Sequence, residues 1–207
     1  MQNEKHKREP LVPGNYYHVY NRGNNGIDVF FDSNNYEYFL KLYYQYVHPI
    51  AETYAWCLMK NHFHFLVYIR TENEVLKDLL EYSTVEKPKV LDPSKQFGHL
   101  FNAYTQAVNK RYTRTGVLFE KPFERKRVTS EKYLKNLIYY IHNNPVHHGF
   151  TKNINDYPWS SFESIIVDKP TKLQREDVLE IYGGKDNFVD YHSKEQVFDE
   201  ISDFIID

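Results

Sequence analysis

The chain of 207 residues is long enough for one well-cored domain with an appendage, and its 41% hydrophobic and 17% aromatic content excludes a disordered protein. A single cysteine, Cys57, excludes a disulfide framework, and we expect a cytoplasmic protein because residues 1–10 are charged and no apolar run approaches the ~20 residues that span a bilayer. The formal net charge of −2 divides into +5 for residues 1–160 (21 Lys and Arg against 16 Asp and Glu) and −7 for residues 161–207 (5 against 12), so it does not exclude a polyanionic partner.

The first half of the chain predicts a strand, a helix and a hairpin. Residues 16–22 alternate in the manner of a strand, and a Gly- and Asn-rich cluster ends it. A helical period follows, with Ser33 as a candidate N-cap and Pro49 as the stop. Residues 52–59 predict a second strand, and only Lys60 and Asn61 separate it from a third, so these two strands should pair as an antiparallel hairpin.

The middle of the chain predicts helix, loop and helix. A short helical segment is expected at residues 75–82, and the Lys- and Pro-bearing residues 85–96 predict an insertion or loop. A longer helix is expected at residues 97–112. Residues 117–128 then predict an extended segment, which Pro122 confines to a sheet edge or a bend.

The last third of the chain is mostly helical in pattern. Ser130 is a strong N-cap for a helix over residues 131–143, which Pro145 should stop because proline disfavours helical geometry in the residue before it. Further on, residues 176–183 and 197–205 carry weak helical patterns.

The element order predicts the fold class. Strand, helix, strand, strand, helix, strand describes an α+β fold, a ferredoxin-like antiparallel sheet with helices packed on one face. We expect a polar leader (residues 1–15), a core domain (16–162) and an acidic helical C-terminal extension (163–207).

The third strand carries a candidate metal site. It reads NHFHFLVYIR over residues 61–70, and alternation along a strand places His62 and His64 on one face and Phe63 and Phe65 on the other. Two neighbouring imidazoles on a rigid strand can hold one divalent metal ion. The alternative is that two half-exposed histidines alternate by chance.

A basic stretch is a candidate nucleic-acid surface. Seven basic and two acidic residues lie between Lys110 and Arg127, interleaved with Phe119 and Phe123. Such a pattern is typical of surfaces that follow a phosphate backbone and stack bases, although an ordinary edge strand would look alike. The candidate DNA-contacting residues are Arg22, Lys110, Arg111, Arg114, Lys121, Arg125, Lys126 and Arg127.

Four segments resemble one known family. NHFHFLV, GVLFEKPFERKRV, YYIHNNPVHHG and DYPWSSF occur in the order found in the REP-associated tyrosine transposases, single-tyrosine members of the HUH class of single-strand DNA endonucleases. The resemblance covers residues 16–162. It implies that His62 and His64 bind a divalent cation and that Tyr140, placed by the pair Asn144-Pro145, is the nucleophile. In related transposases the residue four positions after the tyrosine completes the metal site, and here that residue is Asn144.

The resemblance also implies an activity. The expected reaction is metal-dependent cleavage and transfer of single-stranded DNA at hairpin-flanked sites through a 5′-phosphotyrosine intermediate. Two nitrogens and one amide oxygen suit Mg²⁺ or Mn²⁺ better than a closed zinc site. The expected partner is a single-stranded DNA hairpin, the location is the cytoplasm at the nucleoid, and the chain is a monomer or a homodimer, in which subunits of related enzymes exchange their tyrosine helices.

Two alternatives and one choice between residues stay open. The chain could be a domesticated protein that binds structured DNA without cutting it, or a metal-dependent hydrolase in which water attacks. Tyr139 stands beside Tyr140, and neighbouring helical positions point about 100° apart. If Tyr140 shares a face with Asn144, Tyr139 should turn aside into the packing between helix and sheet.

Overall fold

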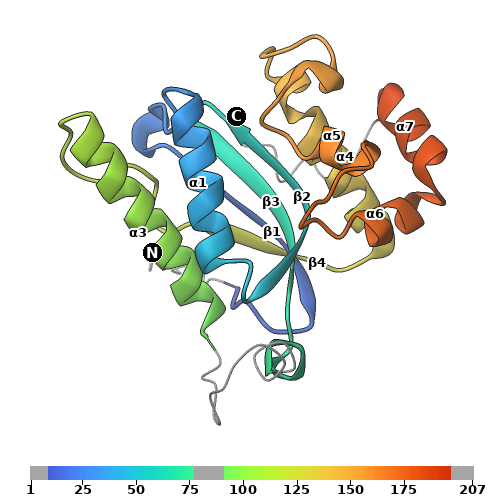
Figure 1. Ribbon diagram of the computed structural model, residues 1–207, viewed down its shortest axis with the longest axis horizontal. Coiled ribbons are helices and arrows are strands. Elements are labelled where there is room, and N and C mark those ends of the chain that lie inside the picture. The colour runs from blue at the N-terminus through green and yellow to red at the C-terminus, as the bar shows by residue number, and fades with distance from the viewer. Residues whose placement is uncertain (1–8, 77–90, 197–207) are drawn as a thin grey trace, which may run out of the picture.

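A four-stranded antiparallel sheet forms the centre of the protein, as the computed structural model, which describes residues 9–76 and 91–196, shows (Figure 1). The sheet order is β2-β3-β1-β4, from strands β1 (Asn15–Arg22), β2 (Ala51–Met59), β3 (His62–Ile69) and β4 (Glu124–Val128). This order is that of a ferredoxin-like sheet, so the predicted α+β fold class is confirmed.

β3 pairs with β2 on one side and with β1 on the other. β2 and β3 are joined through Lys60 and Asn61 as a tight antiparallel hairpin, which confirms the prediction. On the other side of β3, Arg22 lies opposite His62. The chain leaves β1 at Gly23, where an added Cβ would lie 1.9 Å from the carbonyl oxygen of Ile27, so only glycine fits this close approach.

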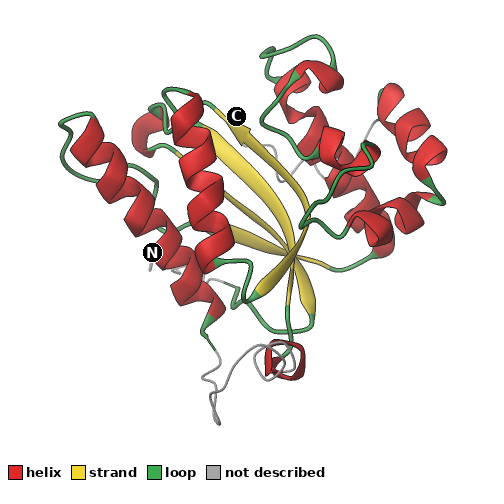
Figure 2. Ribbon diagram, in the orientation of Figure 1, coloured by secondary structure: helices red, strands yellow, loops and turns green. Residues whose placement is uncertain are grey.

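Two helices cover one face of the sheet (Figures 1 and 2). α1 (Ser33–Tyr46) and α3 (Pro93–Arg111) lie side by side there, over a core of aromatic rings. The predicted cap of α1 was wrong by one residue: the Asp32 carboxylate, and not Ser33, accepts the hydrogen bond of the Asn35 amide. A carboxylate also interacts favourably with the positive end of the helix dipole.

α3 begins earlier than predicted. The sequence placed residues 93–96 in a loop and began the helix at Phe97, whereas Asp92 caps a helix that starts at Pro93. Proline is well suited to the first helical position, since its missing N–H would have no partner there. Residues 72–76 are helical, and the rest of the predicted helix and loop lies outside the described residues.

α4 (Glu131–His147) packs on the opposite face, against β2 and β3. Ser130 caps it, as predicted: its hydroxyl oxygen accepts from the Tyr133 amide at 3.1 Å. The predicted end at Asn143 was wrong, because the helix continues through Pro145 to His147. Only the last turn follows this proline, so few helical hydrogen bonds depend on it.

Among the described residues, a 3-10 helix (Ile154–Asp156) and three further α-helices follow α4. The α-helices are α5 (Phe162–Ile166), α6 (Arg175–Tyr182) and α7 (Lys185–Ser193), and they lie on the α4 side of the sheet (Figure 2). The Tyr54 hydroxyl on β2 donates to Asp177 of α6 at 3.0 Å, and the Tyr182 hydroxyl donates to the Lys135 carbonyl of α4 at 2.7 Å. The described part of residues 163–207 is therefore mostly helical and contacts β2 and α4; the pattern at residues 197–205 lies outside the described residues.

The last two expectations concern the extended segment 117–128 and the absence of a membrane-spanning helix. Of the predicted extended segment 117–128, only Glu124–Val128 forms a strand, at the sheet edge as Pro122 indicated, and an isolated bridge joins Phe119 to Gly23. Within residues 9–76 and 91–196, no helix is long and apolar enough to cross a membrane.

Candidate active site

The alternation predicted for β3 is present. His62 and His64 point toward α4, where the ring of His64 lies 5.5 Å from that of Tyr140. Phe63 points to the other face, 5.3 Å from the ring of Phe39 on α1. The strand therefore contributes its phenylalanines to the core and its histidines to the space beneath α4.

α4 brings the other two predicted residues to the same place. Tyr140 and Asn144 are four residues apart and share one face of the helix. Asn144 is fully buried, with its Oδ1 3.3 Å from His62 Nε2, and Tyr140 is 8% exposed. The candidate nucleophile and all three candidate metal ligands thus meet within one chain.

Each of the two ring nitrogens of His62 lies against an amide oxygen. Its Nδ1 lies 2.7 Å from Asn61 Oδ1, and its Nε2 faces Asn144 Oδ1. A neutral imidazole has one N–H for these two amide oxygens. If the proton is on Nδ1, Nε2 and the Asn144 oxygen face each other as two lone pairs, which is the arrangement that binds a cation.

Burial keeps the two histidines neutral. Desolvation, with the nearby His148 and Arg22 opposing a further positive charge, lowers the pKa of His62 to about 4. Burial, with His18, His62 and His148 close by, holds the pKa of His64 well below the ordinary 6.5. Both imidazoles are therefore in the form that binds metals at neutral pH.

The spacing of His62 and Asn144 suits two neighbouring ligands of a six-coordinate divalent cation. Adjacent ligands in an octahedron with bonds of about 2.1 Å lie about 3 Å apart, and the His62 nitrogen and Asn144 oxygen are separated by 3.3 Å. The His64 Nε2 atom is buried and accepts or donates no hydrogen bond within the described residues. No three His, Cys, Asp or Glu side chains in that part of the chain are grouped so that they could hold a metal ion; in the candidate set, the third ligand is the Asn144 amide.

Two histidines at the site were missed in the sequence. His18 of β1 is fully buried, with its Nε2 2.8 Å from His64 Nδ1. The ring of His148 lies 5.0 Å from that of His62. Spacing could have indicated His148, since it follows Asn144 by four residues, whereas the contact of His18 depends on strand register.

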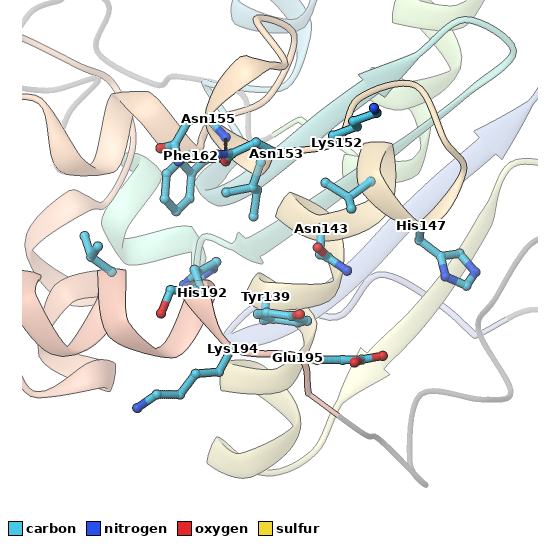
Figure 3. A pocket seen from close by; sticks show the side chains of 14 residues that line it. Tyr139, Asn143, His147, Lys152, Asn153, Asn155, Phe162, His192, Lys194 and Glu195 are labelled. Atoms are coloured by element: carbon cyan, nitrogen blue, oxygen red, sulfur yellow. Dashed lines mark hydrogen bonds between the residues drawn. The ribbon is translucent and has the colours of Figure 1, made fainter.

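Tyr139 lies on a different side of α4. Its ring contacts His192 of α7 at 5.4 Å and lines a cavity of about 570 Å³ together with Asn143 and Lys152 (Figure 3). The prediction that Tyr139 turns aside from the candidate metal site is confirmed. Its predicted place between helix and sheet was wrong, because α7 covers that side of the helix.

The candidate DNA-contacting residues do not form one cluster. Arg22, opposite His62, pairs with Glu120 at 2.8 Å. The basic residues of β4 alternate between the two faces of the sheet, and Lys126 is the one directly opposite His18. At the end of α3, Arg111 binds Asp32 at 2.8 Å. The remaining members are the exposed Lys110, Lys121 and Arg127, the half-buried Arg114, and Arg125, which stacks on Phe123.

Comparisons with known proteins and with solved structures give matches, and a comparison with family models gives none. No family model matches the chain. A Haemophilus influenzae protein provisionally named a REP-associated tyrosine transposase is 26% identical over 116 residues, which are 56% of this chain and 61% of that protein, so the match spans less than two thirds of the relative.

The comparison with solved structures finds the same fold in one protein. The solved structure of a REP-associated tyrosine transposase bound to a REP hairpin covers 81% of this chain and 90% of its own, with a TM-score of 0.60 and 17% identity. A bacterial tRNA(His) guanylyltransferase-like protein in complex with GTP has a TM-score of 0.40, 11% identity and 68% coverage of both chains. The resemblance to the transposases is therefore confirmed in sequence and in fold.

Proposed function

We propose that this chain is a metal-dependent transposase that cuts single-stranded DNA at hairpins and holds the cut end on Tyr140. One observation carries the proposal: α4 places Tyr140 and Asn144 directly against His62 and His64 of β3, in one buried site. A phenol and a set of cation ligands in contact are what a phosphodiester transfer through tyrosine requires.

The chemistry assigned to each residue follows from its position. The Tyr140 oxygen loses its proton and attacks the scissile phosphorus, and the bond from phosphorus to the 3′ oxygen breaks. The 3′ oxygen takes up a proton, so the products are a 5′-phosphotyrosine and a free 3′-OH, with no net proton released. His62, His64 and Asn144 would hold Mg²⁺ or Mn²⁺, which when bound neutralises phosphate oxygens. Such help is needed because an unperturbed phenol, with a pKa of about 10, is a weak nucleophile.

A DNA hairpin is the substrate that we propose. The similar solved structure is that of a protein bound to a REP hairpin, and the H. influenzae relative carries the same family name. On this chain, Arg22 lies beside the histidine site and Lys126 on the same face of the sheet, where both could contact phosphates. Such a substrate places the protein in the cytoplasm, at the nucleoid.

A denaturing gel tests the proposal. The protein is incubated with end-labelled single-stranded hairpins, taken from the flanks of its gene, in Mn²⁺, Mg²⁺ or EDTA. We expect a protein–DNA adduct and a shortened strand with either metal and neither product with EDTA. A protein that shifts hairpins on a native gel but yields no adduct would instead be a binding protein, and cleavage without an adduct would indicate hydrolysis by water.

A further inference from the structure

We infer that His18 is a positioning residue that fixes the proton of His64 on Nδ1 and so presents His64 Nε2 to the cation. The inference rests on the metal site in the proposed function, and it assigns a role to a residue of β1 outside the ligand set. Its basis is the hydrogen bond between the two rings and the number of protons that this bond can hold.

The two rings are held rigidly. His18 on β1 and His64 on β3 are both 0% exposed, and their rings are stacked at 22° with centroids 5.0 Å apart. Tyr20 packs against His18 at 4.7 Å, and Tyr140 approaches it edge-on at 6.2 Å. With neighbours on both strands and on α4, neither imidazole can turn away without disturbing the core.

The hydrogen bond between His18 and His64 determines which nitrogen of His64 carries the proton. The 2.8 Å contact between His18 Nε2 and His64 Nδ1 holds one proton. If His64 donates it, the other nitrogen of that neutral ring has a lone pair for a cation; if His18 donates it, His64 Nε2 carries a proton and cannot bind one. Only the arrangement in which His18 accepts is compatible with a ligand at His64.

The remaining nitrogen of His64 supports this arrangement. His64 Nε2 is buried without a hydrogen-bond partner among the described residues, and a buried N–H without an acceptor costs about 1–3 kcal/mol. A proton on Nδ1 gives the N–H of His64 an acceptor in His18 Nε2, and the N–H of the neutral His18 ring then lies on its own buried Nδ1. An outer residue that fixes the tautomer of a histidine ligand is a common way to raise metal affinity.

Mn²⁺ binding to the DNA-free protein, measured by calorimetry, tests the inference. His18→Phe keeps a flat buried ring and removes the acceptor, so the dissociation constant should rise about 10- to 100-fold. His18→Gln returns an oxygen near the Nε2 position and should recover most of the affinity. His99→Phe removes an exposed histidine on the other face of the sheet and should leave affinity unchanged. Equal affinity in His18→Phe and the parent would overturn the inference.

Nitrogen NMR of the parent protein gives an answer that does not depend on any variant folding. The metal-free protein should show His64 protonated on Nδ1, with that proton coupled across the hydrogen bond to His18 Nε2. A proton on His64 Nε2 would overturn the inference. Failure of the parent to bind Mn²⁺ would remove the metal from the proposed function itself, whereas parent binding that His18→Phe leaves intact would refute only the role of His18.

Discussion

Two groups of buried histidines flank α4, and they differ in how completely they are hydrogen-bonded. On the α7 side, His142 Nδ1 lies 3.1 Å from His192 Nε2, and His142 Nε2 lies 2.8 Å from Ser161 Oγ. This series of hydrogen bonds ends at the Phe188 carbonyl oxygen, which lies 2.8 Å from His192 Nδ1. A carbonyl oxygen only accepts, so the position of each proton in this series of hydrogen bonds is fixed. All four ring nitrogens of His142 and His192 take part in it.

The group on the β3 side is incomplete. His62 faces two amide oxygens with one N–H to give, and His64 Nε2 has no partner within the described residues. Folded proteins leave few buried polar atoms unsatisfied, and the exceptions concentrate at functional sites. A closed histidine network holds helices together, whereas an open one of similar burial is suited to a ligand.

The largest effect should come from removing a ligand of the open group. His64→Ala should lower cleavage at least about 100-fold, because the cation loses one of its protein ligands. Hairpin affinity, measured by native gel shift, should stay close to that of the parent, since it comes mostly from phosphate and base contacts elsewhere. Cleavage at the parent rate by His64→Ala would refute the metal site.

Removing a member of the closed group should instead affect stability. His142→Ala leaves His192 and Ser161 without their partner and opens a cavity, so the free energy of unfolding should fall by about 2–4 kcal/mol. His62→Ala, in the open group, should cost less than half as much, and the exposed His147→Ala should change it by no more than about 0.5 kcal/mol. Urea unfolding measures all three, and equal losses at His62 and His142 would erase the distinction.

Acid should destabilise the protein through buried histidines of both groups, and His192 reports on the closed one. Burial lowers the pKa of His192 to about 4 from the ordinary 6.5, so between these values the unfolded chain binds more protons than the folded one. Stability should therefore be complete above pH 6.5 and fall as the pH drops toward 4, by about 2–3 kcal/mol at pH 4.5 from this residue. His192→Gln, which keeps an acceptor for His142, should flatten the decline; a parent whose urea midpoint is equal at pH 7 and 4.5 would contradict this.

The smallest effect concerns single phosphate contacts. Lys126 lies on the face of the sheet that carries the histidines, whereas the Arg125 guanidinium stacks on Phe123 at 4.4 Å and donates to Ser94 at 2.9 Å. Lys126→Gln should therefore reduce the steepness of the fall in log affinity with log salt by about 0.7–0.9. Arg125→Gln should lower it less. An unchanged slope in a variant with Arg125, Lys126 and Arg127 all neutralised would mean that β4 is only a charged edge strand.

Periodicity made most of the fold predictable, and the resemblance to the transposases identified the four residues of the candidate site. The alternation around His62 and His64 and the four-residue spacing of Tyr140 and Asn144 are local properties, and local geometry survives in the fold. The end of α4 was not predictable from Pro145 alone, because whether a proline stops a helix depends on how many turns follow it.

Contacts between distant segments were beyond the sequence. The bond from His18 to His64 depends on β1 pairing with β3, 46 positions apart, and a shift of the register by one residue would turn His18 to the other face. The position of Tyr139 against α7 likewise depends on where an acidic segment folds back, and the charge of that segment indicated only an extension.

The most direct test of the proposed site is to identify the tyrosine that carries the DNA. Hairpin cleavage products are trapped, digested with protease and mapped by mass spectrometry, in the parent protein and in the matched variants Tyr140→Phe and Tyr139→Phe. Each variant removes one oxygen with little change of shape, so both should fold and bind hairpins as the parent does. The 5′-phosphate should map to Tyr140, and the adduct should be lost in Tyr140→Phe and kept in Tyr139→Phe. An adduct that survives in Tyr140→Phe and disappears in Tyr139→Phe would contradict the account.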